Sequence, residues 1–260
     1  MSSSSIKFTI NHIKKLKNTA APFATLTAYD FTSGQIIDEA QIPLILVGDS
    51  ASMMIYGYDT TLPITMEEML LIVKAVSRGV KCSLVVADMP FLSYQPSIEE
   101  TIKNAGLFLK EGGASAVKLE GGQHIGKHIK SLVDCGIPVL GHIGLTPQSY
   151  HQLSGYKIQG KNPKDAQKII DDALSVQESG AFGVVLECIP PELAKKITKT
   201  LSIPTIGIGS GKHCDGQIQV FHDILGYGPS KPPKHAMQYD NMYKNVATVV
   251  QQYKKDVENN

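Results

Sequence analysis

The sequence predicts an α/β fold, a (β/α)8 TIM-type barrel. Short apolar runs rich in β-branched residues recur along the chain, and segments with helical periodicity lie between them. The apolar runs are nearly continuous, as strands buried on both faces require. The length is 260 residues, of which 42% are apolar, and barrels of about 250 residues commonly form one domain. We therefore expect a single domain over residues 1–260, with residues 1–5 disordered.

Seven apolar runs predict strands, because most of them are bounded by Gly or Pro. They are FATLTAYD (23–30), IPLILVGD (42–49), SLVVADM (83–89), AVKLEG (116–121), IPVLGHIG (137–144), GVVLEC (183–188) and IPTIGIGS (203–210). A weaker eighth strand near IQVFHDIL (218–225) favours a closed barrel over an open doubly wound sheet. The chain lacks a G-x-G-x-x-G motif after a strand, so a dinucleotide-binding fold is not favoured.

The segments between the strands carry helix-boundary signals. Thr65 and Glu68 form a capping-box pattern before a helix that ends at Gly79, and Ser97 with Glu100 repeats the design. A proline near the start and a glycine past the end are typical of helix boundaries. Two further helices are predicted in KDAQKIIDDALSVQESG (164–180) and PPELAKKITKTLS (190–202).

Both ends of the chain predict a further helix. Residues 1–29 contain no acidic residue, as in transit peptides, but they also contain no arginine. The spacing of Ile10, Ile13 and Leu16 favours a short helix that is part of the fold. We expect the lysines of KKLKN (14–18) to be solvated. At the other end, a proline cluster reads as a surface excursion and precedes a predicted helical tail, NVATVVQQYKKDVE (245–258).

Composition excludes several function classes. The formal net charge of +1 gives no sign of a nucleic-acid partner, and no apolar run approaches the roughly 20 residues of a membrane helix. The four cysteines are far apart, which indicates reduced thiols in a cytoplasmic protein without a zinc site or disulfides. Arg78 is the sole arginine, so a bidentate arginine clamp on a substrate carboxylate is nearly excluded.

Polar residues follow several of the predicted strands. Asp49 with Ser50, Asp88, Lys118 with Glu120, and Glu187 all lie at strand ends, where barrel active sites are found. Strand side chains alternate between faces. Val117 and Leu119 should therefore face the helices, while Lys118 and Glu120 point into the barrel.

Structural roles compete with this interpretation. Capping or turn formation explains Asp49 or Asp88, taken alone, as well as a site does, and Lys118 with Glu120 could be a structural ion pair. All of them together are harder to explain structurally, since clustered buried carboxylates repel one another. A cation should lie among them, either Lys118 or a hard divalent ion such as magnesium or manganese.

Three weaker signals remain open. His142 is either a hydrogen-bonded histidine of the barrel interior or a site-lining residue. Gln148 and Ser149, after Thr146-Pro147, are weak candidates for polar lining. GIGSG (207–211) fits a tight turn better than a phosphate site.

Ten motifs in order give the chain a specific resemblance. They are TLTAYD, LVGDSASM, DTTLPIT, ADMPFLSY, AVKLEGG, GHIGLTPQS, GYKIQG, VLECIP, IPTIGIGSG and DGQIQVFHD. Together they resemble the 3-methyl-2-oxobutanoate hydroxymethyltransferase (ketopantoate hydroxymethyltransferase) family over about residues 25–234. Two segments depart from the family pattern, at Tyr58 and His235, which leaves folate contacts and assembly less defined.

The resemblance implies a barrel of the phosphoenolpyruvate/pyruvate-like kind and a homodecamer of two five-membered rings. It implies hydroxymethyl transfer from 5,10-methylenetetrahydrofolate to 3-methyl-2-oxobutanoate, giving 2-dehydropantoate, the first step of pantothenate biosynthesis and of the coenzyme A pathway. The carried-over roles are as follows: Mg²⁺ ligands Asp49, Asp88 and Glu120; substrate contacts Asp49, Ser50, Asp88 and Lys118; general base Glu187.

Two rival functions stay open. A metal-dependent 2-oxo acid lyase on the same barrel would share the acidic set without needing folate. Such lyases usually carry a reactive cysteine in a mobile loop, whereas Cys188 directly follows Glu187 and should point away from the site. A non-catalytic barrel scaffold is the second rival, and the intact set of polar strand ends is the argument against it.

Overall fold

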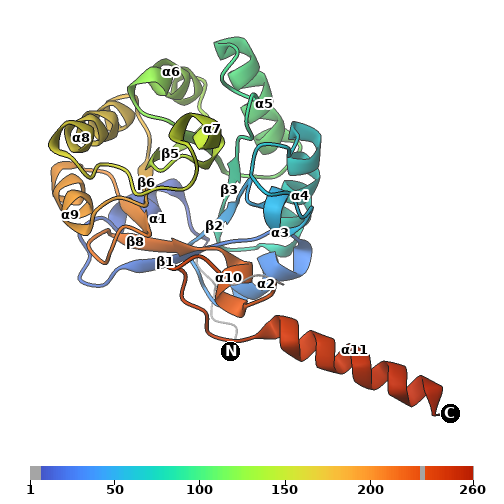
Figure 1. Ribbon diagram of the computed structural model, residues 1–260. Coiled ribbons are helices and arrows are strands. Elements are labelled where there is room, and N and C mark those ends of the chain that lie inside the picture. The colour runs from blue at the N-terminus through green and yellow to red at the C-terminus, as the bar shows by residue number, and fades with distance from the viewer. Residues whose placement is uncertain (1–6, 229–231, 260) are drawn as a thin grey trace. The chain divides into compact units, whose positions relative to one another are not determined.

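The computed structural model describes residues 7–228 and 232–259. Eight parallel strands pair in sequence order and close into a barrel, so the predicted barrel is confirmed (Figure 1). The expected disorder of residues 1–5 lies outside the described residues. The strands are β1 Phe23–Thr27, β2 Leu44–Val47, β3 Leu84–Asp88, β4 Ala116–Glu120, β5 Val139–Gly144, β6 Gly183–Glu187, β7 Thr205–Ile208 and β8 Gly216–Gln219.

The helices of residues 1–218 connect the strands and surround them (Figure 1). The first six α-helices are α1 Ile10–Lys15, α2 Phe31–Glu39, α3 Ala51–Met54, α4 Met66–Gly79, α5 Ile98–Lys110 and α6 Gly126–Asp134. The others are α7 Tyr150–Leu153, α8 Pro163–Glu178, α9 Pro191–Thr200, α10 Phe221–Leu225 and α11 Met242–Glu258, with 3-10 turns η1 Gln123–Ile125 and η2 Pro147–Ser149.

The predicted helix starts agree with the observed caps. Thr65 accepts the N–H of Glu68 while the Glu68 side chain returns to the Thr65 N–H, which completes the capping box of α4. At α5, Ser97 accepts the N–H of Glu100, but Glu100 makes no return bond. Asn162 caps α8, whose first residue is a proline. Each cap satisfies an N–H that the helix itself leaves without a partner.

The eighth strand is shorter than predicted. β8 comprises only Gly216–Gln219, and the FHDIL part of the predicted strand forms α10 instead, with Val220 at its N-cap position. The apolar side chains of that part follow a helical spacing, which a short run of residues does not distinguish from a strand. The weak periodicity therefore located the last strand correctly but extended it too far.

The barrel interior near the N-terminal ends of the strands is an apolar core. Its buried residues come from α1 and from all eight strands: Ile13, Phe23, Leu44, Leu46, Leu84, Val86, Ala116, Leu140, Phe182, Val185, Ile206 and Ile218. Phe8, Ile10 and Leu16 pack against the same core from the N-terminal segment. The predicted helix α1 is thus part of the fold and closes the N-terminal end of the barrel.

The expectation that the lysines of residues 14–18 are solvated is wrong for Lys17. Its ammonium group lies 2.9 Å from Asp215 Oδ2, and its side chain is only 7% exposed. It also donates to the backbone oxygen of Thr198. Asp215 immediately precedes β8, so this ion pair ties the end of the N-terminal helix to the base of the barrel.

The chain divides into two compact units, residues 1–218 and 219–260. The first contains nearly all of the barrel, and the second contains the end of β8, α10 and α11. That one domain spans residues 1–260 stays a prediction. Within the described ranges, every helix is too short or too polar to cross a bilayer.

Candidate active site

The barrel interior changes from apolar to polar along four neighbouring strands. On each of these strands a polar residue lies two positions after a core residue. The core residues are Val86, Ala116, Leu140 and Val185, and the polar residues are, in the same order, Asp88, Lys118, His142 and Glu187. Residues two apart on a strand share a face, so these four polar side chains share the interior face. The prediction that Lys118 points inward is therefore confirmed, and the polar groups gather at the C-terminal end of the barrel.

The strand register brings these residues together. Asp88 lies beside Lys118, and Glu120 lies beside His142, on neighbouring strands. Glu187 lies beside Gly144 at the last pair of β5 and β6. At Gly144 a Cβ atom would come within 2.4 Å of the Glu187 carbonyl oxygen, so only glycine permits this close approach.

Lys118 lies among the carboxylates. Its Nζ is 2.7 Å from Asp88 Oδ1 and 3.5 Å from Glu120 Oε1, and all three side chains are at most 4% exposed. Burial alone would lower the pKa of Lys118, but Asp88, Glu120 and Asp49 raise it above its usual value. The raised pKa favours the charged ammonium group, which partly compensates the acidic cluster.

Asp49 joins this cluster from the end of β2. Its backbone N–H donates to Asp88 Oδ2 at 3.1 Å, and its Oδ2 accepts from Gln148 Nε2 at 2.9 Å. Burial and the neighbouring charges of Asp88 and Glu120 raise the pKa of Asp49 well above its ordinary value. Burial also raises the pKa of Asp88, despite Lys118. Negative charge is thus in excess here.

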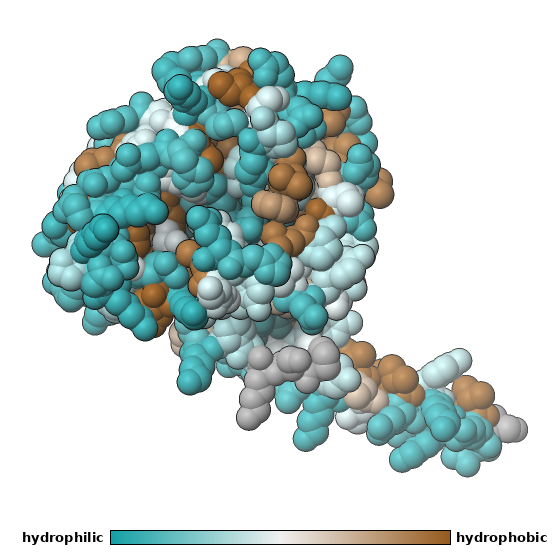
Figure 2. Space-filling model, turned by 45° about the horizontal axis from the view of Figure 1, so that its top comes forward, coloured by the Kyte–Doolittle hydropathy of each residue, from teal (hydrophilic) through white to brown (hydrophobic). Residues whose placement is uncertain are grey.

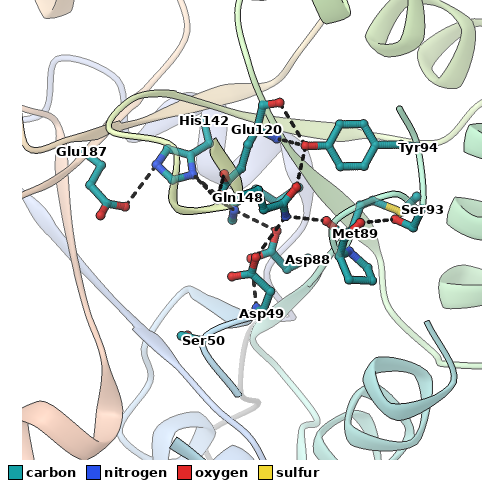
Figure 3. A network of polar contacts seen from close by, with 12 residues as sticks. Asp49, Ser50, Asp88, Met89, Ser93, Tyr94, Glu120, His142, Gln148 and Glu187 are labelled. Atoms are coloured by element: carbon teal, nitrogen blue, oxygen red, sulfur yellow. Dashed lines mark hydrogen bonds and ion pairs between the residues drawn. The ribbon is translucent and has the colours of Figure 1, made fainter. Parts of the chain in front are cut away.

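His142 connects the cluster to Glu187 (Figure 3). Its Nδ1 is 3.2 Å from Glu120 Oε1, and its Nε2 is 3.1 Å from Glu187 Oε2. Burial and Lys118 lower the pKa of His142, but Glu120 and Glu187 raise it more strongly, to about 9. Glu187 is the most exposed carboxylate of the group, with a side chain 16% exposed, so it reaches the opening of the barrel.

Helix capping does not explain the polar strand ends. Ser50 occupies the N-cap position of α3 without a side-chain cap, and its Oγ instead lies 2.7 Å from the Tyr29 hydroxyl. α5, the helix after Asp88, begins only after Ser97, which caps it. The capping alternative is therefore wrong for Asp88, and Ser50 does not cap a helix either. Asp49 also faces other side chains rather than a helix terminus.

The carboxylates suit a hard divalent cation in chemistry and in charge. Asp88 Oδ1 and Glu120 Oε1 are buried and make no hydrogen bond of good geometry, although both face cationic groups. Oxygen ligands of this kind match magnesium or manganese. As they stand, no three His, Cys, Asp or Glu side chains of residues 7–228 and 232–259 enclose a metal position. Lys118 Nζ lies between two of the oxygen donors instead.

Three residues of the network lacked a strong sequence signal. Gln148 was only a weak candidate, yet it is 5% exposed and joins Asp49 to the rest of the cluster. Tyr94 and Tyr29 were not predicted at all, although each is almost fully buried and each hydroxyl contacts a site residue. The sequence showed only that each tyrosine follows a strand closely. Many tyrosines with purely structural roles occupy such positions.

Two other sequence signals have structural explanations. GIGSG forms a tight turn, with Gly209 and Gly211 at positive φ and Ser210 Oγ donating to the Leu186 carbonyl. Cys188 lies just beyond β6 with φ of 47°, and burial and the Glu187 carboxylate raise the pKa of its thiol to about 11. A protonated thiol is a poor nucleophile, which does not support the cysteine-dependent lyase.

Solved structures of low sequence identity share the fold. A phosphonomutase-type protein from Burkholderia cenocepacia superposes with a TM-score of 0.66 at 14% identity, covering 92% of this chain and 97% of that one. 2,3-Dimethylmalate lyase, of the PEP mutase/isocitrate lyase superfamily, gives a TM-score of 0.61 at 15% identity, covering 96% and 98%. These likenesses support the barrel fold, and the phosphoenolpyruvate/pyruvate-like kind of barrel stays a prediction.

Sequence comparison is more specific. A 3-methyl-2-oxobutanoate hydroxymethyltransferase from Carboxydothermus hydrogenoformans is 53% identical over 96% of this chain and 91% of its own length. The enzyme of that name from Geobacter metallireducens is 50% identical over 96% and 94%. The family model described as ketopantoate hydroxymethyltransferase matches residues 7–260. The chain therefore belongs to the ketopantoate hydroxymethyltransferase family.

Proposed function

We propose that this chain transfers a hydroxymethyl group from 5,10-methylenetetrahydrofolate to 3-methyl-2-oxobutanoate, giving 2-dehydropantoate. Membership of the family makes the chain an enzyme of the hydroxymethyltransferase type. The reaction would be the first step of pantothenate biosynthesis. The folate co-substrate and the residue roles are part of the proposal, and the geometry of the network supports the residue roles.

One observation carries the proposal: a partly exposed carboxylate faces a buried acidic cluster across a histidine. Glu187 lies at the opening, His142 contacts it at 3.1 Å, and Glu120 lies on the other side of His142. Proton removal next to a ketone needs a base beside the substrate and cationic groups at the oxygen that gains charge. This arrangement provides both within a single network.

The chain's own residues have separate tasks in the proposed mechanism. Glu187 takes the C3 proton of the 2-oxo acid, and C3 then forms a carbon–carbon bond to the one-carbon unit. Both carbon–nitrogen bonds of that unit break, tetrahydrofolate leaves, and one water supplies the hydroxyl oxygen of the product. Lys118 supplies positive charge to the substrate oxygens, because its pKa keeps it an ammonium ion. Ser50, which Tyr29 orients at 2.7 Å, contacts the 2-oxo acid. His142, held between two carboxylates, fixes the orientation of the base.

A magnesium ion would be held by Asp49, Asp88 and Glu120. When bound, it would act as a Lewis acid on the 2-oxo acid. The excess of buried negative charge and the poorly bonded oxygens of Asp88 and Glu120 support this set. Asp88→Ala should weaken magnesium-dependent binding of the 2-oxo acid, and an unchanged affinity would argue against its role as a ligand. The exposed position of Arg78 in the last turn of α4 agrees with recognition of the substrate without an arginine.

One assay tests the function against its rivals. The protein is incubated in D₂O with 3-methyl-2-oxobutanoate and magnesium, with and without methylenetetrahydrofolate. The proposed enzyme exchanges the C3 proton in both samples and forms 2-dehydropantoate only with folate. Carbon–carbon cleavage without folate would identify a lyase, and no exchange in either sample would identify a scaffold.

We also propose a homodecamer and a cytoplasmic location. α11 carries a stripe of exposed apolar side chains at spacings of three and four residues, which suits association with other copies (Figure 2). The stripe comprises Tyr243, Val246, Val250, Tyr253 and Val257. Val250→Glu should lower the mass measured by light scattering, and an unchanged mass would exclude this stripe as a contact. The free cysteines support the location.

A further inference from the structure

Gln148 has no role in the proposed function. It nevertheless contacts more residues of the network than any residue that does have such a role. It lies in η2 after β5, and its buried side-chain amide makes four hydrogen bonds, three of them to residues labelled in Figure 3. Nε2 donates to Asp49 Oδ2 and to the Met89 carbonyl, both at 2.9 Å. Oε1 accepts from the Tyr94 hydroxyl at 2.8 Å and from Gln95 Nε2 at 3.2 Å.

These contacts fix which way the amide points. A side-chain amide has two donor hydrogens and one acceptor oxygen with two lone pairs, and all four are used here. Both partners on the Nε2 side are acceptors, and both on the Oε1 side are able to donate. Turning the amide over would place Oε1 against the Asp49 carboxylate and the Met89 carbonyl, so the donor is directed at Asp49.

The backbone of Gln148 holds a second carboxylate. Its N–H donates to Glu120 Oε2 at 3.0 Å. This bond does not depend on the side chain, whereas the bond to Asp49 does. One residue thus orients two of the three proposed magnesium ligands, and a side-chain substitution should release only Asp49.

Tyr94, in the loop that follows β3, supports the same arrangement. Its hydroxyl donates to Gln148 Oε1 and also lies within hydrogen-bond distance of the backbone O and N of Glu120, at 3.0 and 3.2 Å. Tyr94 is 1% exposed, so no solvent competes for its hydroxyl. Tyr94 therefore holds the Gln148 amide, and the amide in turn holds the Asp49 carboxylate.

We propose that Gln148 is a positioning residue, which directs one oxygen of Asp49 toward itself and leaves the other free for the divalent cation and the 2-oxo acid. The inference rests on the proposed function, because it assigns Asp49 to magnesium. Partners of this kind, which hold a ligand rather than the metal, typically change metal affinity by about 10–100-fold when they are removed.

The test is calorimetric titration of magnesium into the full-length protein in saturating 3-methyl-2-oxobutanoate. Gln148→Met keeps the length of the side chain but removes both donors. We expect its magnesium dissociation constant to rise about 10–100-fold, and kcat at saturating magnesium to stay within about twofold. A purely structural role would lower kcat or the melting temperature without a selective change in magnesium affinity.

Two further variants keep the inference testable if Gln148→Met folds poorly. Tyr94→Phe leaves the Gln148–Asp49 bond but removes a support of the amide, so we expect the same change at about threefold to tenfold. Gln177→Met is the matched control, because the Gln177 amide lies in α8 and accepts from Ser202, which follows α9. It should leave magnesium affinity unchanged.

A double-mutant cycle tests whether Gln148 acts through Asp49. In an Asp49→Ala background, Gln148→Met should have no further effect on magnesium affinity. Equal affinities of the wild-type protein and Gln148→Met, or additive effects in the cycle, would overturn the inference while leaving the proposed function intact. If the wild-type protein itself bound no magnesium, the proposed function would fail, and the inference with it.

Discussion

Charged side chains are buried at both ends of the barrel, but in different proportions. At the N-terminal end, Asp215 meets Lys17, and its two oxygens also accept from the backbone of Asn18 and Thr205. At the C-terminal end, three buried carboxylates lie around one lysine, and one of them, Glu120, also contacts His142. The pKa of Asp215 is lowered, because these bonds and Lys17 outweigh the effect of burial, whereas the pKa of Asp49 is raised.

The difference separates a stabilising arrangement from a functional one. A fully bonded carboxylate with a lowered pKa favours the folded state, whereas a carboxylate with a raised pKa opposes it at neutral pH. Asp49 and Asp88 therefore cost stability that Asp215 does not, although the lowered pKa of Glu120 and the raised pKa values of Lys118 and His142 favour the folded state. Buried carboxylates with raised pKa values are typical of functional sites, where a bound ligand or cation compensates their charge.

The largest expected effect is at the C-terminal end. Glu187→Gln keeps the size of the side chain and removes the base, so deuterium exchange at C3 of the 2-oxo acid should fall by about 10²–10⁴-fold. Nuclear magnetic resonance of the substrate in D₂O measures the exchange rate. Magnesium binding should be retained, and exchange at the wild-type rate would reject Glu187 as the base.

At the N-terminal end, Asp215→Ala should act on stability instead. It leaves Lys17 buried without its carboxylate, which typically costs about 3 kcal/mol of unfolding free energy. Urea denaturation at neutral pH measures the loss. Activity per folded molecule should be unchanged, so a variant as stable as the wild type would break the contrast between the two ends.

Asp49→Ala is the matching substitution at the C-terminal end. Because the pKa of Asp49 is raised, its removal should leave the unfolding free energy of the metal-free protein unchanged or increased. Magnesium affinity in the presence of the 2-oxo acid should fall by about 100-fold. A loss of stability as large as that of Asp215→Ala would mean that both clusters are structural.

The pH dependence of stability sharpens the comparison at the N-terminal end. The folded pKa of Asp215 lies below its ordinary value of 3.8, so the unfolded chain binds its proton first as the pH falls. Its contribution is complete above that value and is lost as the pH drops through the folded pKa. The stability difference between wild type and Asp215→Asn should be constant from about pH 7 to 5 and shrink below about pH 4. A constant difference down to pH 3 would contradict this assignment.

The smallest expected effect concerns Arg78. It is exposed in the last turn of α4, which precedes β3, so it lies at the N-terminal end of that strand. Arg78→Gln should change the affinity for the 2-oxo acid by less than about twofold. Isothermal titration measures the affinity, and a larger loss would show that the substrate carboxylate does meet an arginine.

The sequence alone determined the barrel and most of its elements. Strand runs buried on both faces and capping residues such as Thr65 depend on local composition, so they can be recognised in isolation. The inward direction of Lys118 also followed from simple alternation. The weakest prediction, the eighth strand, failed in its length because a short apolar run fits a helix equally well.

Only the tertiary structure decided how the polar residues share their contacts. Gln148 and Asp49 are 99 residues apart, and the bond between them depends on how β2 and the turn after β5 meet at the barrel opening. The same packing decided that Ser50 turns to Tyr29 instead of capping α3, and that Lys17 is buried against Asp215. Sequence patterns specify which face a side chain takes, whereas its partner depends on distances between segments that only the closed barrel fixes.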